Sequence, residues 1–373
     1  MHEPLNLALA KGKNFGWAVC SHYIEQELRK LGLPIRMVDE TSPAELPGTV
    51  FHALADRDLN PLHNVRGSRN IGYTFFENEL TGQSRDNAAR YDLVLAGSTW
   101  CCRKLLDHGI ANSGTLIQGI DPTRFSPLPP KEDDKLFIVF SGGKFELRKG
   151  QDIVLSAFRK IQKKYNDIIL MNMWYNFWPE SMAMFQHSRH IMFSSQGDDW
   201  NAFMQHIYRI NGLDPKRIIT LGAIDNERLA AVYAKTDLGV FPNRCEGGTN
   251  LVLMEYMACG KPVIASQTSG HKDILSPDNS LLLDRLTPYP IYDGNKTLWA
   301  DWEEPSVDQL VEHIEYAYHH RREMESLGEQ AGKDMLRFTW ADTAASLLHS
   351  IAGVSASPVD PSGSGEATKK EAR

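Results

Sequence analysis

The sequence predicts an α/β fold in which two Rossmann-like domains, each built on a parallel sheet, face each other across a cleft. Short apolar, β-branched runs alternate with helical patterns along almost all of the 373 residues. Such alternation of strand and helix implies parallel sheets with right-handed crossovers. A proline-rich interruption divides the pattern into two halves, and at roughly 150 residues per domain the length fits two domains.

The elements of the first half are identified by the spacing of their apolar residues. The stretch Ala18–Leu31 repeats Val19, Tyr23, Ile24 and Leu28 on one helical face. The other elements expected there are a helix at Thr99–Asp107 and strands at Leu5–Ala10, Ile35–Asp39, Thr49–Leu54, Ile71–Phe76, Leu93–Ala96 and Leu116–Gly119.

The interruption lies at Asp121–Pro130, where four prolines in ten residues exclude regular structure. The alternation then resumes, and the last amphipathic pattern precedes a tail of Ser, Pro, Gly and charged residues that we expect to be disordered. The expected units are an N-terminal domain (1–125), a linker (126–134), a C-terminal domain (135–337), a last helix (338–353) and the tail (354–373).

The second half repeats the same rhythm of strand and helix. Its expected strands are Leu136–Phe140, Ile168–Met173, Ile218–Leu221, Leu238–Phe241 and Val263–Ala265. Its expected helices are Gln151–Tyr165, Trp200–Asn211, Asn226–Lys235, Gly248–Cys259 and Val307–His320. Ligands of such sheets bind beyond the carboxyl ends of the strands.

Composition and charge restrict the function. The chain carries 40 Lys+Arg and 47 Asp+Glu, a net charge of −7 with His neutral, unlike the basic surface of a nucleic-acid-binding protein. No apolar run approaches the roughly 18–20 residues of a membrane span. The N-terminal apolar run has no basic region before it, so it does not resemble a signal peptide. The five cysteines lack CxxC spacing, as in a reduced protein. We therefore expect a cytoplasmic protein that binds no nucleic acid and carries no metal site.

The motif with the clearest chemistry follows the strand Leu238–Phe241. Gly247 and Gly248 permit a tight turn, and Thr249 or Asn250 can cap the helix that follows. Since the first backbone N–H groups of a helix are free, this turn suits a pyrophosphate.

Two glutamates frame this motif. Glu255 is the one charged residue in an apolar helical run, and ribose hydroxyls would satisfy a buried carboxylate there. The alternatives are a solvent-facing glutamate or one paired with a structural arginine. Glu246 stands at the strand end where ligands bind, or simply stabilises the start of the helix.

Two further turns follow strands. Ser141–Gly150 contains glycines and the cations Lys144, Arg148 and Lys149, which could neutralise a diphosphate, although an exposed basic turn is the alternative. It is not a P-loop, because GxxxxGK[ST] is absent. Ala10–Trp17 is a glycine-containing turn without GxGxxG.

Three phrases together resemble the retaining nucleotide-sugar glycosyltransferases of the GT-B fold, specifically their family four (glycosyl transferases group 1). They are Gly119-Ile-Asp-Pro-Thr-Arg-Phe-Ser-Pro127, Gly143-Lys-Phe-Glu-Leu-Arg-Lys-Gly150 and the run from Glu246 to Val263. The resemblance covers about Leu5 to Leu348. It implies two Rossmann-like domains and a C-terminal helix that crosses back onto the first domain.

The resemblance also implies roles for residues. Lys149 matches the lysine on the donor diphosphate, and Lys144 replaces an arginine, keeping its charge but losing its fork. Glu246 would face the donor sugar and Glu255 the ribose. The implied catalytic residues are Lys149, Lys144, Glu246 and Glu77. The implied donor-binding residues are Gly16, Gly143, Gly247, Gly248, Thr249, Asn250 and Glu255.

Two departures from the family stand out. The strand that usually ends in a histidine reads Ile71–Asn78, so Glu77 or Asn78 takes that place. The spacing from Glu246 to Glu255 is nine residues instead of eight, with the extra residue in the phosphate-facing turn.

The resemblance therefore implies a hexosyltransferase-like enzyme of glycan or polysaccharide assembly. It would move a sugar, with retention and without a metal or permanently bound cofactor, from a UDP- or GDP-sugar to a glycan, lipid-linked or small-molecule acceptor. Peripheral contact with the inner face of the membrane stays open. So do two alternatives, a sugar-nucleotide 2-epimerase and an inactive nucleotide-sugar- or glycan-binding relative.

Overall fold

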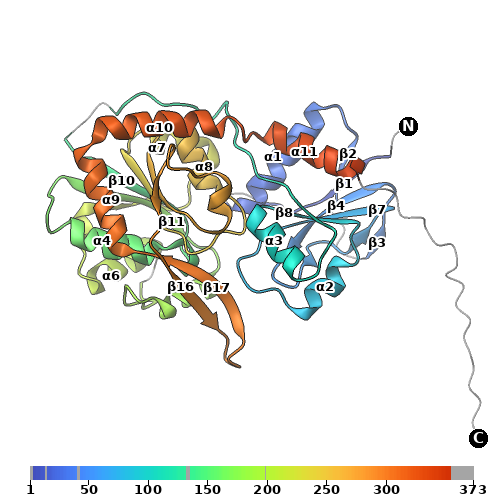
Figure 1. Cartoon of the computed structure of the whole chain (residues 1–373), viewed down its shortest axis with the longest axis horizontal. Helices are drawn as coiled ribbons and strands as arrows, with labels where there is room; N and C mark the ends of the chain where they lie inside the picture. Colours follow the sequence, from blue (N-terminus) through green and yellow to red (C-terminus); the bar gives the residue numbers. More distant parts are fainter. Residues whose placement is uncertain (1–2, 13–14, 40–42, 132–134, 198, 354–373) are drawn as a thin grey trace, which may run out of the picture.

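The computed structural model describes residues 3–12, 15–39, 43–131, 135–197 and 199–353. Two parallel sheets, each flanked by helices, form two halves that lie side by side (Figure 1). They confirm the predicted fold class. The expected tail, 354–373, lies outside the described residues.

The first sheet has the strand order β2-β1-β4-β7-β8-β9, with every neighbouring pair parallel, and β5 pairs antiparallel with β4. Its strands are β1 (Leu5–Ala8), β2 (Ile35–Met37), β4 (Thr49–Ala55), β5 (Asn60–Pro61), β7 (Arg69–Thr74), β8 (Leu93–Ala96) and β9 (Ser113–Thr115), and β3 (Ala44–Glu45) pairs with β6 (Val65–Arg66) beside it. Its helices are α1 (Gly16–Lys30), α2 (Gly82–Ala88) and α3 (Thr99–Asp107).

The predicted strand Leu116–Gly119 is wrong, because the last strand of this sheet lies earlier, at Ser113–Thr115. Pairing decides its position: Val94 stands opposite Ser113 in the parallel register, and Leu116 makes only one more backbone hydrogen bond, to Ala96. A polar edge strand of three residues carries too little apolar pattern to be recognised from sequence.

The second sheet has the order β12-β11-β10-β13-β14-β15, again parallel throughout. In chain order this is 3-2-1-4-5-6, the doubly wound arrangement that reverses between β10 and β13. The loops after these two strands therefore meet in one crevice. The strands are β10 (Phe137–Lys144), β11 (Ile168–Tyr175), β12 (Ile218–Thr220), β13 (Leu238–Phe241), β14 (Val263–Ser266) and β15 (Leu281–Leu283).

The helices of the second half cover both faces of this sheet. They are α4 (Gln151–Ile161), α5 (Pro179–Met182), α6 (Trp200–Ile210), α7 (Leu229–Tyr233), α8 (Leu251–Ala258), α9 (Val307–His319) and α10 (Arg321–Met335). Short 3-10 turns are η1 (Leu147–Lys149), η2 (Ala183–His187), η3 (Pro215–Arg217), η4 (Asn226–Arg228) and η5 (Ser269–Asp273).

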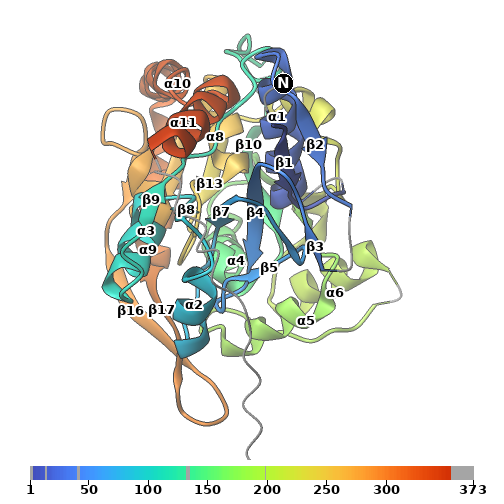
Figure 2. The same ribbon diagram turned by 90° about the vertical axis from the view of Figure 1, so that its right-hand side faces the viewer.

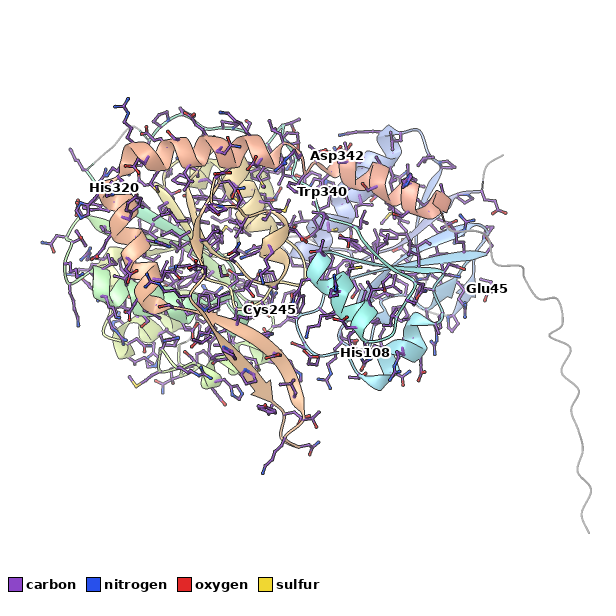
Figure 3. All side chains as sticks on the ribbon, in the orientation of Figure 1. Glu45, His108, Cys245, His320, Trp340 and Asp342 are labelled. Atoms are coloured by element: carbon purple, nitrogen blue, oxygen red, sulfur yellow. The ribbon has the colours of Figure 1, made fainter. Side chains whose placement is uncertain are left out.

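The last helix, α11 (Trp340–Gly353), lies on the first half beside α1 (Figure 1). Trp340, Ala344 and Leu347 join the apolar core that also contains Tyr23 and Leu28. Tyr23 and Trp340 stack with their ring planes 6° apart and centroids 5.4 Å apart. Figure 3 labels Trp340 where the chain returns from α10 to the first half.

A long hairpin of β16 (Leu286–Tyr292) and β17 (Leu298–Pro305) leaves the second half and has no counterpart among the predicted elements. It lies on the same side of the molecule as α3 (Figures 1 and 2). Arg244, fully buried, holds it: its guanidinium donates twice to Asp152 of α4, at 2.8 Å each, and to Glu304 of β17 at 2.6 and 3.0 Å.

Candidate active site

The two loops after β10 and β13 lie against each other where the strand order reverses. Gly150 adopts φ 72°, and a Cβ atom there would stand 2.0 Å from the carbonyl oxygen of Pro242. Gly143, at the end of β10, has φ 115° and lies beside the side chain of Lys149. Glycines therefore allow the basic loop to sit directly on the loop that carries Glu246.

A buried ion pair joins these loops. The ammonium of Lys149 donates to Glu246, which also accepts from the amide of Asn243. Burial alone would raise the pKa of Glu246, but the charges of Lys149 and Arg148 outweigh it and hold this pKa at about 2. Glu246 is therefore ionised at neutral pH.

Arg148 is the centre of the charge cluster, although the family motif implies no catalytic role for it. Its guanidinium lies 3.2 Å from Glu77, 3.0 Å from Glu146 and 3.2 Å from Glu246. The side chains of Arg148 and Lys149 are only 19% and 11% exposed, which excludes the alternative of an exposed basic turn. In the sequence, Arg148 is one cation in a loop, so the three carboxylates around it could not be predicted.

Glu77 brings the first half into this cluster. Its carboxylate accepts from the backbone N–H of Gly247 at 3.3 Å, and its carbonyl oxygen accepts from the indole of Trp302 at 2.6 Å. Burial raises the pKa of Glu77, an effect that Arg148 opposes and Glu246 reinforces. Glu77 thus contacts both the glycine turn and the hairpin.

Lys144 pairs with one carboxylate oxygen of Glu146, and Arg148 pairs with the other. The ammonium of Lys144 stands 4.5 Å above the ring of Trp178, and Trp178 meets Phe15 of the first half edge-on at 5.8 Å. Gly16 follows Phe15 as the first residue of α1. The basic loop and the first glycine turn therefore face each other across the two halves.

The glycine turn after β13 is buried against the first half. A Cβ on Gly247 would stand 2.6 Å from the carbonyl oxygen of Phe76, and one on Gly248 would stand 3.0 Å from the side chain of Gln118. The backbone oxygen of Gly247 accepts from the hydroxyl of Ser98 at 2.7 Å. Only glycine permits this approach of the two halves.

The prediction that a side chain of Thr249 or Asn250 caps the following helix is wrong. Asn250 holds the N-cap position of α8 in the left-handed region, φ 66°, with no cap hydrogen bond from its side chain. Its amide turns toward His271 at 3.2 Å, and the Thr249 hydroxyl contacts the sulfur of Met254. The helix starts at Leu251, three residues later than predicted, so the turn before it is longer than expected.

Glu255 is buried on α8, 4% exposed, which rules out a solvent-facing role. Burial raises its pKa to about 8. Within the described chain, no lysine or arginine forms an ion pair with it, which removes the alternative of a structural arginine partner. Its carboxylate accepts from the amide of Asn226 at 2.7 Å, and the oxygen of that amide accepts from the hydroxyl of Tyr23 at 3.1 Å.

The described residues contain no group of three or more His, Cys, Asp and Glu side chains arranged to hold a metal ion. Nor do they include a helix with the length and apolar character needed to cross a bilayer.

Comparison with known proteins points to one family. Residues 178–300 match the family model of the glycosyl transferases group 1. A phosphatidyl-myo-inositol mannosyltransferase from Propionibacterium freudenreichii subsp. shermanii is 34% identical over 62 residues, a match that covers 17% of this chain and 16% of that relative.

Solved structures match nearly the whole chain. HepE from Anabaena, in complex with UDP and glucose, aligns with a TM-score of 0.64 and 13% identity over 94% of this chain and 100% of its own. HepE has also been solved with UDP-glucose. Sucrose-phosphate synthase from Thermosynechococcus elongatus aligns with a TM-score of 0.62 and 14% identity, over 94% of this chain and 98% of its own. The chain therefore has the GT-B glycosyltransferase fold, and its segment 178–300 matches the family model of the glycosyl transferases group 1.

Proposed function

We propose that the protein is a glycosyltransferase that moves a sugar from a nucleoside-diphosphate sugar to an acceptor hydroxyl, with retention of the anomeric configuration and without a metal ion. The observation that carries this is the cluster of Lys149, Arg148 and Glu246 at the point where the second sheet reverses, with Glu255 buried on the helix that follows. Open α/β sheets bind their ligands in this crevice.

Donor binding would divide between the two ends of this motif. Glu255 has a buried carboxyl group without a cationic partner in the described chain, and ribose hydroxyls can donate to its oxygens. Lys149 and Lys144 would hold the diphosphate. The presence of UDP and UDP-glucose in the HepE structures supports a uridine nucleotide as the first donor to test.

In the proposed reaction, the bond from the anomeric carbon to the diphosphate oxygen breaks as an acceptor hydroxyl forms its bond to that carbon on the same face. The hydroxyl proton passes to the departing diphosphate. Lys149 and Arg148 stabilise the negative charge that develops on the leaving group, the kind of preorganised electrostatic contribution that dominates many enzymes. Glu77, with its raised pKa, retains a proton more readily than an exposed glutamate and so repels the diphosphate less.

The acceptor would be a glycan, a lipid-linked sugar or a small molecule held mainly by the first half. Cytoplasmic location and peripheral contact with the membrane stay predictions, as do the domain boundaries and the donor contacts of Gly16, Gly143, Gly248, Thr249 and Asn250.

A thermal-shift screen against UDP-, GDP-, ADP- and dTDP-sugars tests this function. A ligand at 100 times its Kd stabilises the folded protein by about 2.7 kcal/mol. We expect one nucleotide class to raise the melting temperature and the Glu255→Ala variant to lose most of that shift. If no nucleotide sugar shifts the wild-type protein, the proposed function is wrong.

A further inference from the structure

A cavity of about 290 Å³ lies between the first half and the hairpin. Trp100 and Lys104 of α3 form one wall, and Asp301 and Trp302 of β17 form the opposite one. Cys245, which lines the cavity from the second half, is labelled in Figure 3 beside the base of the hairpin, at the boundary between the halves.

The cavity adjoins the candidate active site. Cys245 immediately precedes Glu246, and the hydroxyl of Ser269, also in the wall, accepts from the backbone N–H of Glu246 at 2.7 Å. The indole N–H of Trp302 donates to the carbonyl oxygen of Glu77. A molecule in the cavity would thus lie within one residue of Glu246 and beside the contact between Trp302 and Glu77.

Contacts between the hairpin and the first half keep the cavity in shape. The backbone N–H of Glu79 donates to the carbonyl oxygen of Trp299 at 2.9 Å, beside the bond from Trp302 to Glu77. On the other side, the backbone N–H of Thr99 donates to Asp273 at 2.8 Å. The hairpin wall is therefore fixed to the loop that carries Glu77, and the α3 wall is fixed to η5, whose Ser269 also contacts Glu246.

The chemistry of the walls fits a sugar ring. A pyranose has an apolar face of C–H bonds, which packs on an indole, and hydroxyls at its edge, which donate to carboxylates. The cavity offers the half-buried indole of Trp100, because the indole of Trp302 is only 4% exposed. The exposed carboxylate of Asp301 receives no hydrogen bond from any part of the chain that the structure describes. Lys104, paired with Glu79 at 2.8 Å, adds a donor at the rim. The volume is near the lower end, about 300 Å³, of ligand pockets and suits one ring.

We propose that this cavity binds a saccharide unit of the acceptor, next to the unit that receives the transferred sugar. The proposal rests on the proposed function and makes it more specific, because it requires an acceptor that is an oligosaccharide or a glycoconjugate. Trp100 supplies the stacking face and Asp301 accepts from the hydroxyls.

Ligand-observed NMR with the methyl glycosides of glucose, galactose, mannose and N-acetylglucosamine tests the proposal. We expect at least one glycoside to bind the wild-type protein and to bind at least tenfold more weakly to Trp100→Ala and Asp301→Asn. Tyr292→Ala is the matched control, because Tyr292 is exposed on the same hairpin and does not line the cavity. Asp301 is exposed, so Asp301→Asn keeps the test valid if Trp100→Ala fails to fold.

Calorimetry with UDP, GDP, ADP and dTDP on the same proteins separates the two proposals. We expect nucleotide affinity to be the same in wild type, Trp100→Ala and Asp301→Asn. If a nucleotide binds but no glycoside does, or if both variants bind glycosides as the wild type does, the cavity proposal is overturned and the proposed function stands. If glycosides bind but no nucleotide does, the site cannot be assigned to an acceptor and the proposed function fails as well.

Discussion

Among single residues, Glu255 makes the stability of the proposed nucleotide site depend on pH. Burial raises its pKa to about 8, whereas an unfolded chain keeps a glutamate near about 4.3. Between these values the folded protein holds a proton that the unfolded chain has released. The free energy of unfolding therefore falls as the pH rises through this window, by at most about 1.4 kcal/mol per pH unit.

The variant Glu255→Gln removes this titration and keeps an acceptor for Asn226. We expect its melting temperature, relative to wild type, to rise by several degrees from about pH 5 to about pH 8.5. Glu312→Gln, which alters an exposed carboxylate paired with Arg285, serves as the control and should show little pH dependence. A melting-temperature difference for Glu255→Gln that does not change with pH would mean that the carboxyl is already ionised at pH 5.

Lys149 is the residue on which turnover should depend most. Lys149→Ala removes a charge from the leaving-group side and leaves Glu246 without its ammonium partner, so we expect kcat to fall by about 10²–10³, as for the loss of one oxyanion-hole donor. Steady-state kinetics with the best donor measures this. Lys163→Ala, an exposed lysine outside the site, should behave as wild type. A near-normal kcat would remove Lys149 from the leaving-group role.

Among the elements, the hairpin depends on one buried arginine. Arg244→Met would leave Asp152 and Glu304 buried without their cation, and breaking such a pair costs about 3–5 kcal/mol. Urea unfolding measures the loss. Arg285→Met breaks the exposed pair with Glu312 and should cost about 0–1 kcal/mol. Equal losses in the two variants would show that the hairpin is not held by this cluster.

Most strands and helices could be predicted from the sequence, but not all of the contacts between their residues. Strand–helix alternation was sufficient for two parallel sheets, because buried parallel strands are apolar on both faces. The hairpin was missed although Asp293-Gly294 lies between alternating strands, a turn signal that was available. Lys149, Glu246 and Glu255 could be named as candidate site residues from the motif. Asn226 and Arg148 could not, because their contacts are with residues far away in the chain.

For the whole molecule, a contact between the two halves reaches the proposed nucleotide site through a chain of hydrogen bonds. The hydroxyl of Tyr23, on α1 of the first half, donates to the Asn226 amide that in turn donates to Glu255. This bond orients the amide so that its N–H groups point at the carboxylate. Approach of the halves therefore helps to position Glu255.

Tyr23→Phe should weaken nucleotide binding by about two- to tenfold, the effect of one hydrogen bond of roughly 0.5–1.5 kcal/mol. Calorimetry with the best nucleotide gives the affinity. Tyr165→Phe is the control, because its hydroxyl faces His319 on the outer surface of the second half. If Tyr23→Phe has no effect while Asn226→Ala does, the amide is positioned without help from the first half.

The central claim is that the crevice between the halves cleaves a nucleoside-diphosphate sugar and transfers the sugar. The most direct measurement is NMR of UDP-, GDP-, ADP- and dTDP-sugars incubated with the protein and an oligosaccharide mixture, in wild type and in Lys149→Ala. We expect the wild-type protein to release nucleoside diphosphate from one donor and to form a new glycosidic linkage with the donor's anomeric configuration. We expect the rate of this transfer to be lower by about 10²-fold or more in Lys149→Ala. Conversion of the donor to an epimeric nucleotide sugar without release of nucleoside diphosphate, or no conversion of any donor, would contradict it.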